Sequence, residues 1–164
     1  MVLTNIKNKQ KESGFTIVEL LVVIVVIGIL AAITIVSYTG ITAKANATKA
    51  LSNAQSVKNV AEIFNAEGSN VYPADAAAIT GYTTGTAKVP TGVTVVQAAQ
   101  NVPTNATSGA NNGLSYVSYM AKTNNTGGCI AYYDFSNNPT PGLKYVYVGD
   151  ATTADFTAST PTCS

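Results

Sequence analysis

A run of 22 residues, Phe15 to Val36, dominates this chain, because only four of its members are not apolar: Thr16, Glu19, Gly28 and Thr34. At a rise of about 1.5 Å per residue, a helix of this length reaches about 33 Å, enough to cross the roughly 30 Å hydrocarbon core of a bilayer. Lysines in residues 1–14 are expected to stay in the cytoplasm, so the rest of the chain emerges on the outer side. The run therefore predicts one membrane-spanning helix.

Two simpler interpretations of this run leave features unexplained. A secretory signal peptide has a shorter apolar part, of about 7–15 residues, that ends at a small-residue cleavage site. Here Ala31 and Ala32 are followed by further apolar residues, which argues against such a site. A plain single-pass anchor explains the length and the lysines, but it gives no reason for Glu19 or for the sequence "SGF" before it.

Glu19 is the residue that separates these interpretations. An ionised side chain at the centre of a membrane helix costs about 2.5–3.5 kcal/mol on insertion scales, and such groups usually face a partner inside an assembly. If the chain is cut between Gly14 and Phe15, a new α-amino group appears one helical turn before Glu19. The amine of a neighbouring copy, displaced along the helix axis, could then pair with this carboxylate and set the stagger between subunits.

The segment "KESGFTIVELLVVIVVIGILAA", residues 11–32, resembles the N-terminus of type IV pilins and pseudopilins. That family has a short basic leader ending in Gly, then Phe, then Glu four positions later within a hydrophobic helix. The positions that match are Lys11, Gly14, Phe15, Thr16, Glu19 and Leu20. The resemblance covers residues 7–36. One departure is Val36, at a position where many members of the family carry proline.

The resemblance implies a sequence of events for residues 1–36. A membrane prepilin peptidase would cut after Gly14, which makes residues 1–14 a leader peptide, and would N-methylate Phe15. Residues 15–36 would hold the chain in the cytoplasmic membrane before assembly. A pilus or secretion assembly platform would then add it to a homo-oligomeric helical filament at the cell surface, in which Glu19 is the assembly residue.

Residues 37–67 continue the helix with a different pattern. Apolar or small residues recur every three or four positions, which predicts one stripe on an amphipathic helix. Its members are Ile41, Ala45, Thr48, Leu51, Ala54, Val57, Ala61 and Phe64. Gly68 follows Glu67 as a plausible stop. We therefore expect a single helix over residues 15–67, whose hydrophobic first half protrudes and whose second half packs on a sheet.

Residues 68–164 predict a small globular head. Compared with residues 15–67, they are rich in Gly, Ser, Thr, Asn and Pro. Four short apolar segments predict strands, at residues 93–96, 114–120, 129–135 and 143–148. Turn sequences at 123–128 and 136–142 predict an antiparallel meander, and residues 68–92 a long loop. Alternation places Cys129, Ala131, Tyr133 and Phe135 on one face, with Leu143, Tyr145 and Tyr147 on one face of the next strand. The fold class expected is α+β.

Composition excludes several classes of function. Nine lysines, no arginine and eight acids give a net charge of +1, so a nucleic-acid partner is not expected. The chain has no histidine, and its two cysteines lie too far apart to predict a zinc site. The nine tyrosines mostly alternate with small or apolar residues, which is typical of sheet packing. No nucleophile–base pair or phosphate loop is present, so we expect neither an enzyme nor a bound cofactor.

Cys129 and Cys163 are the two cysteines of the head. An exported domain lies in an oxidising compartment, where a disulfide between them would fasten the C-terminal tail to a strand. The alternative is a pair of free thiols.

Asp134, Asp150 and Asp155 are candidate metal ligands. Some pseudopilins bind calcium in C-terminal loops, and oxygen-rich loops suit that ion. The spacing here matches no calcium-loop motif, however, and turn-forming aspartates explain the same residues.

The sequence therefore predicts a structural subunit of a type IV pilus-like filament. Two alternatives stay open: a pseudopilin of a type II secretion or DNA-uptake machine, and an uncleaved, membrane-anchored binding domain at the surface.

Overall fold

The computed structural model describes residues 14–68, 70–82, 86–103, 113–136, 142–157 and 162–164. The turn predicted at 136–142 lies almost wholly outside these residues. The chain divides into two compact units, Met1–Thr39 and Gly40–Ser164.

The long helix α1 covers Ile17–Glu67, which is 51 residues. It therefore begins two residues later than predicted, and its predicted end is confirmed. At that end the Gly68 amide donates to the Phe64 carbonyl over 2.8 Å, which closes the last turn. In the first unit the large apolar side chains from Phe15 to Ile35 are between 47% and 91% exposed, so they have no protein cover of their own.

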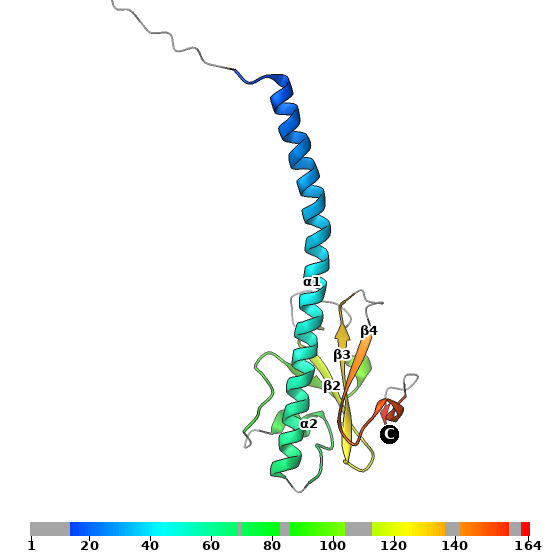
Figure 1. The fold of residues 1–164 in the computed structure, drawn as a ribbon. Helices are drawn as coiled ribbons and strands as arrows, with labels where there is room; N and C mark the ends of the chain where they lie inside the picture. Colours follow the sequence, from blue (N-terminus) through cyan, green and yellow to red (C-terminus); the bar gives the residue numbers. More distant parts are fainter. Residues whose placement is uncertain (1–13, 69, 83–85, 104–112, 137–141, 158–161) are drawn as a thin grey trace, which may run out of the picture. The chain divides into compact units, whose positions relative to one another are not determined.

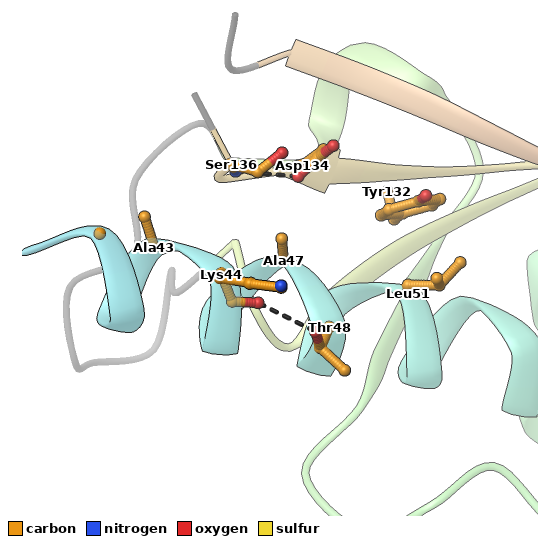
Figure 2. Close-up of a pocket in the computed structure, with 9 residues that line it drawn as sticks. Ala43, Lys44, Ala47, Thr48, Leu51, Tyr132, Asp134 and Ser136 are labelled. Carbon is orange, nitrogen blue, oxygen red and sulfur yellow. Dashed lines mark hydrogen bonds between the residues drawn. The ribbon is translucent and has the colours of Figure 1, made fainter. Parts of the chain in front are cut away.

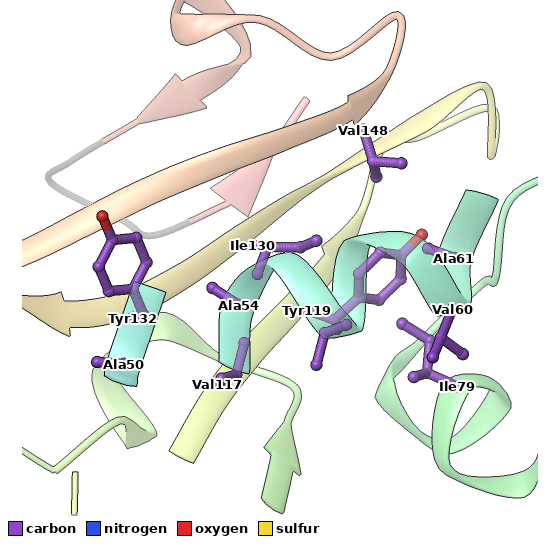
Figure 3. Close-up of a cluster of buried hydrophobic side chains, with 11 residues drawn as sticks. Ala50, Ala54, Val60, Ala61, Ile79, Val117, Tyr119, Ile130, Tyr132 and Val148 are labelled. Atoms are coloured by element: carbon purple, nitrogen blue, oxygen red, sulfur yellow. The ribbon is translucent and has the colours of Figure 1, made fainter. Parts of the chain in front are cut away.

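In the second unit one face of α1 packs on the sheet (Figure 3). The predicted stripe is correct from Ala54 onward, where Ala54, Val57 and Ala61 are buried. Its first part is wrong, because Ile41, Ala45 and Thr48 are exposed. The spacing of apolar residues does not by itself determine which face of a helix packs against a sheet. In this structure Ala50 and Val60 are also part of the buried face.

A four-stranded sheet has the order β1–β2–β3–β4 (Figure 1). Its strands are β1 Thr94–Val96, β2 Tyr116–Ala121, β3 Gly127–Asp134 and β4 Gly142–Gly149. All four predicted strands are present, and β2, β3 and β4 pair antiparallel. The prediction of a fully antiparallel meander is wrong at β1, which runs parallel to β2. The long connection between these two strands, residues 97–115, leaves room for the chain to return in the same direction.

The inner face of the sheet forms the main core with α1 (Figure 3). Val117 and Tyr119 of β2, Ile130 and Tyr132 of β3, and Val148 of β4 meet the small and branched residues of the helix. The Tyr119 hydroxyl donates to the Pro73 carbonyl over 2.9 Å, so this buried phenol is satisfied. These contacts confirm that tyrosines serve sheet packing in this region.

The segment 68–92, predicted to be a loop, contains the short helix α2, Ala76–Gly81. Asp75 caps it, because its Oδ1 accepts the Ala78 amide at 2.7 Å. Ile79 of α2 is fully buried against the core. The prediction failed because the helix has only six residues, too few for a periodic pattern.

The outer face of the sheet is covered by other elements. Cys129 and Ala131 of β3 belong to a second cluster, beside Leu143, Tyr145 and Tyr147 of β4, which confirms the predicted face for these residues. The prediction is wrong for Phe135, because β3 ends at Asp134 and Phe135 packs against the main core. The short 3₁₀ helix η1, Ala99–Asn101, adds the buried Ala99 to this cluster. A two-stranded sheet of β5, Phe156–Thr157, and β6, Thr162–Cys163, completes it. We call this pair of strands the C-terminal strap; the sequence predicts the attachment of the tail through Cys163 but not the two strands.

Gly149, at the end of β4, has a backbone that side chains tolerate poorly. Its φ is +66°, and a Cβ there would lie 2.3 Å from the Thr126 carbonyl oxygen and 2.7 Å from the Gly127 Cα. Gly149→Ala is therefore expected to lower the free energy of unfolding by more than about 2 kcal/mol. Guanidinium unfolding of the full chain in detergent, followed by tyrosine near-UV circular dichroism, measures this.

Gly142, at the other end of β4, supplies the matched control. Nothing lies within 4 Å of a Cβ built there. Gly142→Ala should change the free energy of unfolding by less than about 1 kcal/mol. Equal effects at the two glycines would contradict the account of Gly149.

Candidate functional site

The start of α1 is set by two side chains that hydrogen-bond to each other. Gly14, Phe15 and Thr16 are not helical, and the first helical residue is Ile17. The Thr16 hydroxyl accepts the Glu19 amide at 3.2 Å, and Glu19 Oε2 accepts the Thr16 amide at 2.8 Å. This reciprocal pair is a capping box, which satisfies two amides that have no partner within the helix.

Glu19 receives a third bond in the same arrangement. The Thr16 hydroxyl also donates to Oε2 over 2.8 Å. All three bonds lie after the Gly14–Phe15 peptide, so cutting that peptide leaves them intact. Phe15 itself lies outside the helix, with 91% of its surface exposed. The predicted cleavage position is therefore an accessible, non-helical segment directly before a capped helix.

The surroundings of Glu19 are apolar throughout the first unit. Between Gly14 and Ile35 it is the only ionisable side chain. Among the described residues, α1 is long and apolar enough at its N-terminal end to cross a membrane, judged by length and composition alone. A single carboxylate in such a surface can form one strong charge pair with a cationic group brought by another molecule.

The predicted cysteine pair is present as a disulfide. Cys129 of β3 and Cys163 of β6 are bonded, with 5.7 Å between their Cα atoms. The bond fastens the C-terminal strap to the outer face of the sheet, and both cysteines belong to the cluster beneath it.

Two of the three candidate metal ligands bind a lysine. The Lys122 ammonium lies 3.0 Å from Asp155 Oδ1 and 3.8 Å from Asp150 Oδ1. Asp155 also accepts the amide and the hydroxyl of Thr152, which closes a capping box on the 3₁₀ helix η2, Thr153–Asp155. The cation that neutralises these carboxylates is thus a side chain of the chain itself, and the described residues bring together no group of three possible ligands.

The pH dependence of stability should report this ion pair. The Lys122 ammonium, followed by the Thr152 amide and hydroxyl, holds the pKa of Asp155 below its ordinary value of 3.8. A lowered pKa stabilises the folded state above the ordinary value, and this contribution is lost as the pH falls through the folded-state pKa. Asp155→Asn should therefore lower the urea midpoint at pH 7, by an amount that shrinks below a pH of about 3.8.

Asp134→Asn is the control for that titration. The Asp134 carboxylate forms no ion pair with a described residue and accepts only the Ser136 amide, at 2.9 Å. Its replacement should change the urea midpoint at pH 7 less than Asp155→Asn does, because no ion pair is lost. A midpoint loss for Asp155→Asn that is the same at pH 7 and pH 3 would contradict the assigned role of Lys122.

Asp134 instead lines a groove beside α1 (Figure 2). The groove has a volume of about 530 Å³. Its helical wall is Gly40, Ala43, Lys44, Ala47, Thr48 and Leu51, and its other wall is Tyr132, Asp134 and Ser136. The third metal candidate is therefore separated from the other two.

Comparison with known proteins gives a match over the N-terminal region. The family model described as "Prokaryotic N-terminal methylation motif" matches residues 9–35, which include the capping box and the proposed cleavage position. A fimbrial protein of Pseudomonas aeruginosa is 36% identical over 96 residues. The type II secretion system core protein G of Aeromonas hydrophila is 37% identical over 65 residues.

The N-terminal region of the chain is thus similar to those of fimbrial proteins and of a type II secretion core protein, and it carries the N-terminal methylation motif.

The chain spans less than two thirds of the length of each of these relatives. The alignment with the Pseudomonas fimbrial protein covers 56% of this chain and 62% of that protein. The alignments with core protein G and with fimbrial protein EcpC of Eikenella corrodens, which is 42% identical over 71 residues, each cover 45% of the relative. No solved structure gives a significant match.

Two residues with a role in these arrangements, Thr16 and Lys122, were not predicted from the sequence. Sequence analysis treated Thr16 only as a match to the family pattern, although the spacing Thr-x-x-Glu before an apolar run is a capping-box signal. It gave Lys122 no role, and no local signal could have shown that this residue meets Asp155, which is 33 positions away. Its pairing of Cys129 with Cys163 and its choice of Glu19 required no such long-range information.

Proposed function

We propose that this protein is a structural subunit of a type IV pilus-like filament and that its helix α1 is the assembly element. The observation that carries the proposal is Glu19, a lone carboxylate in an apolar surface that the chain leaves uncovered. Buried helices would hold the filament together, and the head would form its exterior. We assign the protein no catalytic role, because its relatives are named as fimbrial and secretion-system proteins.

In the proposed assembly pathway, the newly made chain first lies in the cytoplasmic membrane. Residues 15–36 span it once, with residues 1–14 inside as a leader. A prepilin peptidase cuts between Gly14 and Phe15 and N-methylates Phe15. An assembly platform then moves the mature chain into a filament of identical copies, which ends outside the cell. The exposed, non-helical Gly14–Phe15 segment supports the first step, since peptidases act on extended chain.

The proposed bond between subunits joins two unit charges. The cationic amine of Phe15 in one copy meets the Glu19 carboxylate of another. At a separation of about 4 Å and an effective dielectric constant of about 20, such a pair is worth about 4 kcal/mol. Because each copy offers one cation and one anion, displaced by one helical turn, the pairing fixes the axial stagger of neighbours.

The second candidate is a pseudopilin of a type II secretion or DNA-uptake machine, which would build a short fibre beneath the surface. The similarity to core protein G favours it. The fimbrial match extends over more of this chain, 56% against 40%, which is why we prefer the pilus. An uncleaved membrane-anchored binding domain is the third candidate, and it leaves Glu19 without a partner.

Deletion of the gene, followed by electron microscopy and shearing of surface fibres, tests the proposal. The pilus account expects long fibres that contain this chain in the parent strain and none in the deletion strain. Fibres that persist unchanged would contradict it. Loss of secretion or DNA uptake with no change in surface fibres would favour the pseudopilin.

A further inference from the structure

We propose that Thr16 is a positioning residue for assembly, which holds one oxygen of the Glu19 carboxylate within its own chain and leaves the other for the neighbouring copy. This inference rests on the proposed function and deepens it. Thr16 makes no contact with the partner in this scheme and acts only through Glu19.

The two oxygens of the Glu19 carboxylate differ in the hydrogen bonds that they accept at the start of the helix. Oε2 accepts both the amide and the hydroxyl of Thr16, each at 2.8 Å. Oε1 accepts no bond from any residue of the described chain. One acceptor is therefore occupied before assembly, and one remains for a donor from outside.

The two hydrogen bonds from Thr16 to Glu19 are important because the side chains around them are apolar. A carboxylate taken from water into an apolar medium loses its hydration, and only hydrogen bonds or an opposite charge replace it. Bonds from two donors to an ionised oxygen are of the strong, charge-assisted kind. Thr16 can thus keep the Glu19 side chain in one orientation in lipid while no partner is present.

The same bonds favour pairing between chains over pairing within one. The Phe15 nitrogen takes no part in the capping box, although it would become the nearest cation after cleavage. To reach Oε2 of its own Glu19, that amine would have to displace one of the two Thr16 donors, which already hold this oxygen on the cap. An amine from another copy can approach Oε1 without breaking the box.

Three variants of the full chain test the proposal in cells that assemble the wild type. Thr16→Val has nearly the same shape but no hydroxyl, and it is expected to reduce sheared-filament yield at least tenfold, with leader removal and membrane amount unchanged. Thr16→Ser restores the hydroxyl and should restore the yield to within about twofold. Thr48→Val is the control, because that exposed hydroxyl on α1 donates only to the Lys44 carbonyl, and its yield should stay at the wild-type level.

Nuclear magnetic resonance of the cleaved chain in micelles separates positioning from simple helix capping. In the wild type the Thr16 amide resonance should move as Glu19 titrates, and in Glu19→Gln it should not. In Thr16→Val the Cα shifts of Ile17 and Val18 should remain helical while yield falls. Loss of yield only together with loss of those helical shifts would assign Thr16 a capping role and overturn the inference.

Failure of the inference can be told from failure of the proposed function. Wild-type filaments together with an unimpaired Thr16→Val variant overturn the role of Thr16 alone. A wild type that makes no filament overturns both.

Discussion

Glu19→Ala is expected to abolish filament assembly while leaving insertion into the membrane intact. The variant removes the only ionisable side chain between Gly14 and Ile35. Insertion should not be impaired, because the variant removes a charge from an apolar helix; the cost of such a charge is greatest at the helix centre, about 2.5–3.5 kcal/mol, and Glu19 lies in the first turn. The neighbouring amine would lose its partner, so sheared-filament yield should fall at least a hundredfold, a loss consistent with a charge pair of about 4 kcal/mol. Immunoblots of membrane and sheared fractions measure both quantities.

Glu19→Gln isolates the charge from the shape of the side chain. The amide oxygen of glutamine can still accept the Thr16 amide, so the helix start should survive, but no ion pair can form. We expect the same loss of filaments as for Glu19→Ala. A normal filament yield from Glu19→Gln would mean that the carboxylate acts through its hydrogen bonds to Thr16 and not through its charge.

Removal of the disulfide should produce the largest loss of stability in the head. Cys129 and Cys163 are separated by 34 positions, and closing such a loop contributes about 4 kcal/mol in the chain-entropy model. Replacing both with alanine is expected to lower the free energy of unfolding by about 3–4 kcal/mol, a large share of the 5–15 kcal/mol typical of a domain. Alanine is preferred to serine because Cys129 is fully buried and a hydroxyl there would need a partner.

Guanidinium unfolding of the full chain in detergent measures this effect, with reduced wild type as the control. Reduction with dithiothreitol should lower the midpoint as far as the double substitution does, and reduced double variant should show no further change. A loss of less than about 1 kcal/mol in both samples would show that strand pairing and the Lys122–Asp155 ion pair hold the strap without the disulfide.

Local patterns were sufficient to predict the helix, the strands and their faces. The apolar run from Phe15 to Val36 and the stop at Gly68 are contiguous signals, so α1 could be placed to within two residues at its start. Alternation placed Cys129, Ala131 and the β4 residues on the outer face correctly, because neighbouring side chains on a strand point to opposite sides. It failed for Phe135, which follows the last residue of β3.

Relations between distant segments could not be predicted in the same way. The parallel direction of β1 relative to β2 could not be predicted, because a strand of three residues has no sequence signal for the direction of its partner. The exposed positions of Ile41, Ala45 and Thr48 show that the phase of a stripe depends on where the sheet lies along the helix. The ion pair between Lys122 and Asp155 joins residues 33 positions apart, which only the tertiary structure brings together.

At the candidate site, the sequence was sufficient to identify Glu19, whereas the role of Thr16 became clear only from the structure. Glu19 stands out in any reading because it is unlike every residue around it. Thr16 does not stand out, since a threonine in an apolar run is unremarkable until its three hydrogen bonds with Glu19 are seen.

The intact mass of the native chain, isolated from membranes and from filaments, tests the central claim most directly. We predict a chain in both fractions that begins at Phe15 and carries one added methyl group. Native material that retains residues 1–14 in both fractions would contradict the account, because no free amine would then exist to meet Glu19.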